Sequence, residues 1–104
     1  MKIFLDRSNS KYNHCQISNF DKIKNLVEKK KIKSYQPEKL SFKSQINLFK
    51  NSSVVIGAHG AALANITFCK TNTKVIEIIP SDHPNRQTER ISKILNLKYY
   101  RIET

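Results

Sequence analysis

Residues 54–63 read Val-Val-Ile-Gly-Ala-His-Gly-Ala-Ala-Leu. The first three are β-branched, which is typical of a strand that is buried on both faces of a parallel sheet. Gly57 and Gly60 bracket a turn, and a run of small residues suited to the start of a helix begins at Ala61. The stretch therefore predicts a buried strand, a tight turn and a helix in succession, which is the repeating unit of an α/β fold.

Apolar segments on both sides of this unit extend the pattern. Further strands are predicted at residues 2–6, 32–36, 74–79 and 98–102. Helices are predicted from Ser18 or Asn19, after the N-cap Ser41, over 61–69, and over 85–97 with Ile91, Ile94 and Leu95 facing inward. Five strands alternating with four helices predict a Rossmann-like three-layer α/β/α fold, with a five-stranded parallel sheet in the order 2-1-3-4-5.

This strand order nominates a site before any motif is considered. Ligands of open α/β sheets bind beyond the carboxyl ends of the strands, where the strand order reverses. In the predicted order that point lies between the first and third strands, so the loops 7–13 and 57–65 are expected to meet there.

The loop after the third strand suits an anion. Small residues let the backbone approach a ligand, and the amides of a helix's first turn stabilise a group such as a pyrophosphate. His59 adds a side-chain donor at the same place. The dinucleotide fingerprint is absent, since only Gly57 and Gly60 are present, and no Gly-Lys-Ser/Thr follows. By itself the motif also fits a tight structural turn with a surface histidine.

The charge is the strongest signal of the composition. The 104 residues carry a formal net charge of +11, concentrated over residues 22–33. This balance fits a solvated helix face or a patch that contacts an anionic membrane or polymer. Cys15 and Cys69 lack metal-ligand spacing, and we expect a reducing compartment, with Cys69 in the core. The apolar start stops at Asp6, so we expect a strand rather than a signal peptide, and a cytoplasmic, at most membrane-peripheral, protein.

Three collinear motifs carry a family resemblance. They are PEKLSFKSQINLF at 37–49, VVIGAHGAALAN at 54–65 and VIEIIP at 75–80, and a looser match runs to Tyr100. Together they resemble glycosyltransferase family 61, which shares patterns such as P-E-x-L-S-F-x-E-Q-x-x-L-F, I-V-G-P-H-G-A-G-L-x-N and V-I-E-L-x-P. An Arg-Ser pair after the first strand, Arg7-Ser8, extends the match.

The resemblance implies the donor-binding, C-terminal half of an inverting, metal-independent GT-B enzyme of polysaccharide or capsule biosynthesis. Such enzymes take nucleotide sugars, here a UDP-sugar by expectation, and hold no permanent cofactor. The implied diphosphate contacts are His59, Gly60 and Ala61. Asn65 would brace the loop or reach the sugar, and Arg7 with Ser8 would contact phosphate or nucleotide. Glu77, expected at the end of the fourth strand, would bond a ribose or sugar hydroxyl, or else pair with a lysine.

The chain departs from the family pattern at several positions. Cys15-Gln16 stands where the family often carries an arginine pair, which leaves Arg7 and Lys11 as partial substitutes for a phosphate clamp. Ser44 replaces a glutamate, whereas the neighbouring Gln45 is kept and is expected to organise the helix and loop, as is Ser41. Ala58 and Ala62 replace a proline and a glycine, and both are small enough to preserve the approach of the backbone.

Transfer also needs a general base, which GT-B enzymes usually place on an opposing acceptor lobe. We expect residues 1–104 to form a single donor-binding half-domain without that lobe, which would be encoded separately or lie elsewhere in a longer protein. Within the chain, Asp82 and His83 are the nearest candidates for a base, although both also fit an ordinary loop. A glycan acceptor is implied. Two other interpretations stay open: a non-catalytic binder of nucleic acid or another anionic polymer, although few aromatics accompany the lysines, and a flavodoxin-like interaction module.

Overall fold

The computed structural model describes residues 1–5, 29–30, 32–81 and 83–103. These residues form one parallel sheet in the order β2-β1-β3-β4-β5, which confirms the predicted five-stranded parallel α/β sheet and its strand order. The strands are β1 (Lys2–Leu5), β2 (Lys33–Tyr35), β3 (Val54–Ala58), β4 (Lys74–Ile79) and β5 (Lys98–Glu103). The helix predicted from Ser18 or Asn19 lies almost wholly outside the described residues.

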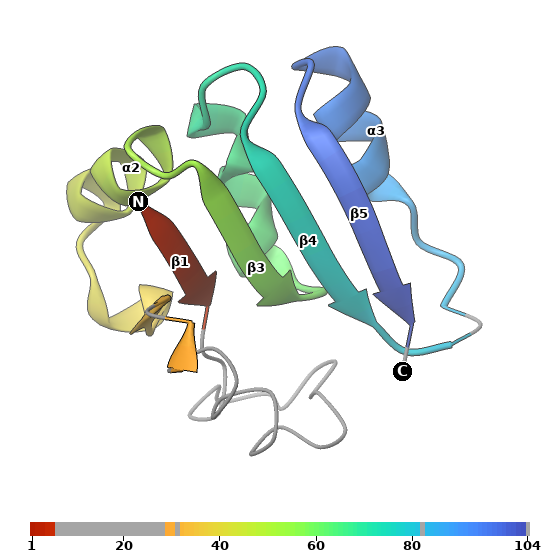
Figure 1. Cartoon of the computed structure of the whole chain (residues 1–104), viewed down its shortest axis with the longest axis horizontal. Helices are drawn as coiled ribbons and strands as arrows, with labels where there is room; N and C mark the ends of the chain where they lie inside the picture. Colours follow the sequence, from red (N-terminus) through yellow and green to blue (C-terminus); the bar gives the residue numbers. More distant parts are fainter. Residues whose placement is uncertain (6–28, 31, 82, 104) are drawn as a thin grey trace.

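The described helical segments cover one face of the sheet. They are the 3-10 turn η1 (Pro37–Lys39), α2 (Phe42–Lys50), the 3-10 helix η2 (Ala61–Phe68) and α3 (Gln87–Ile94). Figure 1 shows α2, η2 and α3 behind the sheet. This placement follows from the handedness of the crossovers. The connections from β2 to β3, from β3 to β4 and from β4 to β5 all move the chain in the same direction across the sheet. Right-handed crossovers that move in the same direction place their helices on the same face.

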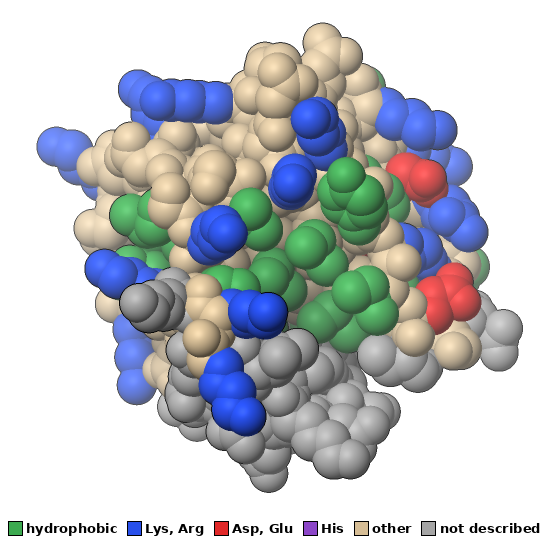
Figure 2. All heavy atoms as spheres, viewed as in Figure 1, with side chains coloured by type: hydrophobic (Ala, Val, Ile, Leu, Met, Phe, Trp, Pro, Cys, Tyr) green, Lys and Arg blue, Asp and Glu red, His purple; other side chains and the backbone are tan. Residues whose placement is uncertain are grey.

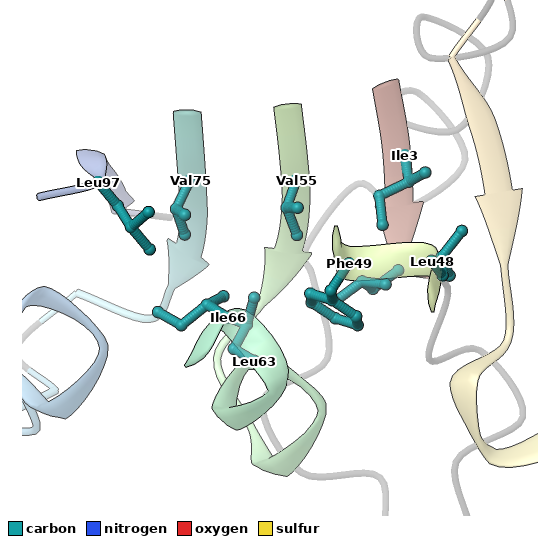
Figure 3. Packing of buried hydrophobic residues seen from close by; sticks show 9 residues of the cluster. Ile3, Leu48, Phe49, Val55, Leu63, Ile66, Val75 and Leu97 are labelled. Atoms are coloured by element: carbon teal, nitrogen blue, oxygen red, sulfur yellow. The ribbon is translucent and has the colours of Figure 1, made fainter. Parts of the chain in front are cut away.

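The core fills the space between the sheet and these helices. Alternate strand residues Ile3, Val55 and Val75 point toward them, and Figure 3 shows these side chains packed against the helical layer. Leu48 and Phe49 come from α2, Leu63 and Ile66 from η2, and Leu97 precedes β5. Cys69 packs against this cluster as expected, and burial raises the pKa of its thiol to about 11.

The other face of the sheet has a different pattern. Strand register aligns Phe4, Ile56, Ile76 and Tyr100 in one row across it. A parallel row at the amino ends of the strands contains Lys2, Val54, Lys74 and Lys98. Figure 2 shows hydrophobic side chains gathered on this face among lysines and arginines. No helix within the described ranges has the length and apolar character that crossing a membrane requires.

The last helix differs from its prediction in two details. The last helix is shorter than the predicted 85–97, and Ile94, which was expected to face inward, is 79% exposed. Ile91 and the C-cap residue Leu95 pack against the core as predicted, together with the buried Thr88 and Ser92, and this stripe leaves Ile94 facing away from the sheet. The segment after β3 is helical as predicted, and it is a 3-10 helix over Ala61–Phe68.

Candidate functional site

His59 stands at the carboxyl end of β3, where the strand order predicts a site. Its backbone N–H donates to the carbonyl of Ile78 at 2.9 Å, which continues the ladder between β3 and β4 for one more residue. This bond fixes where the His59 side chain leaves the sheet. The side chain is 15% exposed, so it lies at the boundary between the core and the surface.

Glu77 holds the His59 ring from inside the fold. The Glu77 side chain is fully buried within β4, and its Oε2 lies 2.7 Å from His59 Nδ1. Its other oxygen, Oε1, accepts a hydrogen bond from the hydroxyl of Tyr99 at 2.5 Å. Because carboxylate oxygens accept hydrogen bonds, we infer that His59 Nδ1 is the donor in this contact. Of the two roles expected for Glu77, the pairing with a lysine was wrong, because the partners of its carboxylate are His59 and Tyr99.

Tyr99 and Arg101 extend the network onto the edge strand. They lie two residues apart on β5 and thus share the face that carries Glu77, and Arg101 is directly opposite Glu77 in register. Burial raises the pKa of Tyr99 to about 12; the hydrogen bond to Glu77 adds to this rise, and the neighbouring Arg101 opposes it. The Tyr99 hydroxyl therefore stays protonated and remains a donor to Glu77 at neutral pH.

His83 joins the same site from the loop after β4. Its ring centroid lies 4.6 Å from that of His59, with the ring planes tilted by 52°. Arg101 holds this loop, because its guanidinium donates to the carbonyls of His83 at 2.9 Å and Asn85 at 3.3 Å. The site thus brings together two histidines that are separated by 24 positions in the sequence.

The two glycines of the loop have different roles, Gly57 in packing and Gly60 at the start of η2. A side chain at Gly57 would place Cβ 3.3 Å from Leu5 Cβ and Cδ1, and 3.4 Å from Leu63 Cδ2, so this glycine permits close packing of β1 and η2 against β3. Gly60 is the N-cap of η2, which begins at Ala61, and its carbonyl accepts from the N–H of Leu63 at 3.0 Å. Because 3-10 hydrogen bonds run from i+3 to i, the amides ahead of Leu63 have no partner within the helix.

Asn65 braces the loop from the other side. Its amide donates to Gln45 Oε1 at 2.7 Å, and Gln45 in turn donates to the carbonyls of Pro37 and Leu40 at 2.9 and 3.1 Å. Ser41 caps α2 as predicted, with its hydroxyl accepting from the N–H of Ser44 at 3.1 Å. These bonds tie η1, α2 and η2 together, which is the organising role expected for Gln45 and Ser41.

Several predicted site residues lie outside the described ranges. They are Arg7, Ser8, Lys11 and Asp82. Among the residues that are described, no three histidine, cysteine, aspartate or glutamate side chains gather as a metal site would require.

The sequence prediction missed Tyr99 and Arg101. Their only signal was the alternation within the last strand, which places both on the face opposite Tyr100 and Ile102. A single sequence does not show that this face of the last strand meets a buried glutamate on the neighbouring strand. Tyr99 and Arg101 come close to Glu77 only through the parallel pairing of β4 with β5.

Comparison with known proteins identifies the family of the chain. The family model for glycosyltransferase 61 matches residues 1–76. A β-1,2-xylosyltransferase of Arabidopsis thaliana is 38% identical over 61 residues, which is 59% of this chain and 11% of that protein. A β-1,2-xylosyltransferase of Oryza sativa subsp. japonica is 38% identical over 63 residues, or 61% of this chain and 12% of that protein. The matched region thus spans about a tenth of the curated relatives' length, and the chain belongs to glycosyltransferase family 61.

Proposed function

We propose that this chain supplies the nucleotide-sugar donor site of a glycosyltransferase, with the donor diphosphate bound at His59, Gly60 and Ala61. One observation carries the proposal: His59 is held 2.7 Å from a fully buried carboxylate at the carboxyl end of β3. Burying a carboxylate is costly unless its hydrogen bonds are satisfied. The presence of a buried carboxylate beside His59 therefore supports a role for this ring beyond the turn itself.

The chemistry asked of this site is stabilisation of a leaving group. Negative charge builds on the diphosphate as the glycosidic bond to the donor breaks, and positioned amides and cations lower the energy of that state. An imidazolium at His59 would have Glu77 as its counter-ion, so the charge needed at the phosphate is balanced within the fold. Glu77 thereby acts through His59 rather than on the sugar. Arg7, Ser8 and Lys11 are proposed to contact the nucleotide or phosphate from the loop after β1.

The names of the two relatives support a choice of donor sugar. Both are named as β-1,2-xylosyltransferases, so we propose a UDP-pentose, UDP-xylose first, as the donor and a glycan as the acceptor. From the family, we also propose that the reaction inverts the configuration at the anomeric carbon and that it needs no metal ion. The general base is assigned to the acceptor side, in a lobe outside residues 1–104, so we expect the chain by itself to bind the donor with little turnover.

Calorimetric titration tests the donor site. UDP, UDP-xylose and UDP-GlcNAc are titrated into the wild-type chain and into His59→Ala, with Lys98→Ala as a control that truncates an exposed side chain at the other end of the strands. We expect binding by the wild type and the control, and at least tenfold weaker binding by His59→Ala, since a hydrogen bond to a charged group contributes about 1.5–3 kcal/mol. Absence of binding at millimolar UDP would refute the proposed site, and equal affinities for UDP-xylose and UDP-GlcNAc would refute the choice of pentose.

A further inference from the structure

We propose that His83 binds the donor diphosphate beside His59 as a second imidazole donor, and that Arg101 is the positioning residue that sets it there. The inference rests on the function proposed above, which it deepens by assigning a second histidine to the same ligand. It also replaces the expected role of His83 as a base.

The first support is the placement of the ring. Pro80 ends the strand segment, and the N–H of His83 donates to the Pro80 carbonyl at 3.2 Å, which folds the loop back toward β3. This turn places the His83 ring 4.6 Å from the His59 ring. A diphosphate bound at His59 would therefore lie within reach of both imidazoles.

The second support is the tautomer of His83. The backbone N–H of Asn85 donates to His83 Nδ1 at 3.2 Å, so Nδ1 is an acceptor and the proton of the neutral ring is on Nε2. His59 has the opposite arrangement, because its Nδ1 donates to Glu77. His83 can thus donate from Nε2 to an anion without carrying a charge. Because Nε2 of this neutral tautomer already carries a proton, it cannot accept another one, which argues against His83 as a general base.

The third support is the way the loop is fixed. The Arg101 side chain is only 11% exposed. Its two Nη atoms donate to the carbonyls of His83 and Asn85, the residues on either side of Pro84. Its Nε donates to Glu103 at 3.2 Å. A planar guanidinium can hold two carbonyls in a fixed geometry, which a lysine ammonium cannot do. The edge strand therefore sets the position of His83 relative to His59.

Two substitutions at His83 separate the donor from the loop bond. In His83→Asn, the side-chain oxygen can still accept from the N–H two residues on, as in an Asx turn, but no donor remains at the Nε2 position. In His83→Gln, the longer amide retains a donor near that position. Arg101→Lys tests positioning, with Arg90→Lys, an exposed arginine on α3, as its matched control.

UDP is the probe for each variant of the full chain, with affinity measured by calorimetry. We expect His83→Asn to weaken UDP binding about tenfold and His83→Gln to stay within about threefold of wild type. Imidazole ¹⁵N shifts give a second measurement: His83 should show the proton on Nε2 in the wild type and in Arg90→Lys, and should lose that signature in Arg101→Lys.

The outcomes distinguish the two proposals. If His59→Ala weakens UDP binding but His83→Asn does not, the role of His83 is overturned and the donor site stands. If His83→Asn and His83→Gln weaken binding equally, the loss does not follow the donor atom, and the inference is again overturned. If the wild type fails to bind millimolar UDP, both proposals fall. A proton found on Nδ1 of His83 would overturn the inference by itself.

Discussion

At the carboxyl ends of β3 and β4, His59 and Glu77 are hydrogen-bonded to each other and almost enclosed, with 15% and 1% of their side chains exposed. At the amino ends of the strands, a row of lysines stands exposed to solvent. These are Lys2, Lys74 and Lys98, aligned by the strand register. Both groups are polar, but His59 and Glu77 are fixed by hydrogen bonds, whereas the three lysines are exposed.

The difference shows that this row of lysines and the candidate site are separate features of the described residues. The charge of +11 suggested an anionic partner, yet these lysines lie at the opposite ends of the strands from His59. Exposed charges about a Debye length apart are largely screened at physiological salt. The lysine row therefore contributes mainly to solubility, whereas recognition of a phosphate depends on groups that are held in place.

The largest effect is expected from removing the buried carboxylate. Glu77→Ala leaves His59 and Tyr99 without their common partner, and breaking a buried charge interaction of this kind typically lowers the free energy of unfolding by about 3–5 kcal/mol. Urea denaturation followed by circular dichroism measures it. Glu89→Ala, which removes a partly exposed i,i+3 pair with Arg86, is the matched control and should cost less than about 1 kcal/mol.

If Glu77→Ala does not fold, Glu77→Gln keeps the shape of the side chain and still offers one acceptor oxygen. We expect it to fold, and to bind UDP more weakly than the wild type, because the counter-ion of His59 is lost. Equal stability of Glu77→Ala and Glu89→Ala would contradict the inference that the buried carboxylate of Glu77 stabilises the fold more than an exposed ion pair does.

The next effect concerns close packing at the carboxyl end. Gly57→Ala would place a methyl group 3.3 Å from Leu5 Cβ, an atom fixed to the backbone of β1, so the strands must shift to admit it. Overpacking of this kind costs about 1–3 kcal/mol. The change is measured by urea denaturation, with the exposed Thr71→Ala as the control. An unchanged denaturation midpoint would show that Gly57 has a role other than packing.

A smaller, pH-dependent effect is expected from Tyr99. Because the pKa of Tyr99 is raised from 10.0 to about 12, its protonated form is favoured in the folded state. The stability it contributes is complete below about pH 10 and is lost as the pH rises toward 12. The difference in denaturation midpoint between wild type and Tyr99→Phe should therefore shrink from pH 9 to pH 11. Tyr100→Phe, half exposed on the other face, should show no such trend, and the same trend in both variants would contradict the assignment.

The smallest effect is expected at the amino end. A Lys74→Gln and Lys98→Gln double variant should change stability by less than about 0.5 kcal/mol per site and leave UDP binding unchanged, because these side chains are exposed. Calorimetry and retention on a DNA column are the two measurements. DNA retention that is lost in this variant but survives His59→Ala would favour the interpretation as an anionic-polymer binder.

Much of the fold was predictable because periodicity and turn chemistry are local. The β-branched run at 54–56, the N-cap at Ser41 and the alternating last strand each indicated their element correctly. Ile94 was assigned wrongly because one residue's rotation around a short helix depends on where the helix begins and ends. The site was predicted in part: the strand order placed His59 at the reversal point, and the family resemblance singled out Glu77.

The sequence by itself determined the parallel α/β fold, the position of the His59 loop at the end of a buried strand, and the family, since each depends on patterns within short segments. Only the tertiary structure decided that Glu77 holds His59, that Tyr99 and Arg101 belong to the same network, and that His83 lies beside His59. The physical reason is that these contacts span 18 to 24 positions and depend on the register of β3, β4 and β5, which forms only when the sheet is assembled.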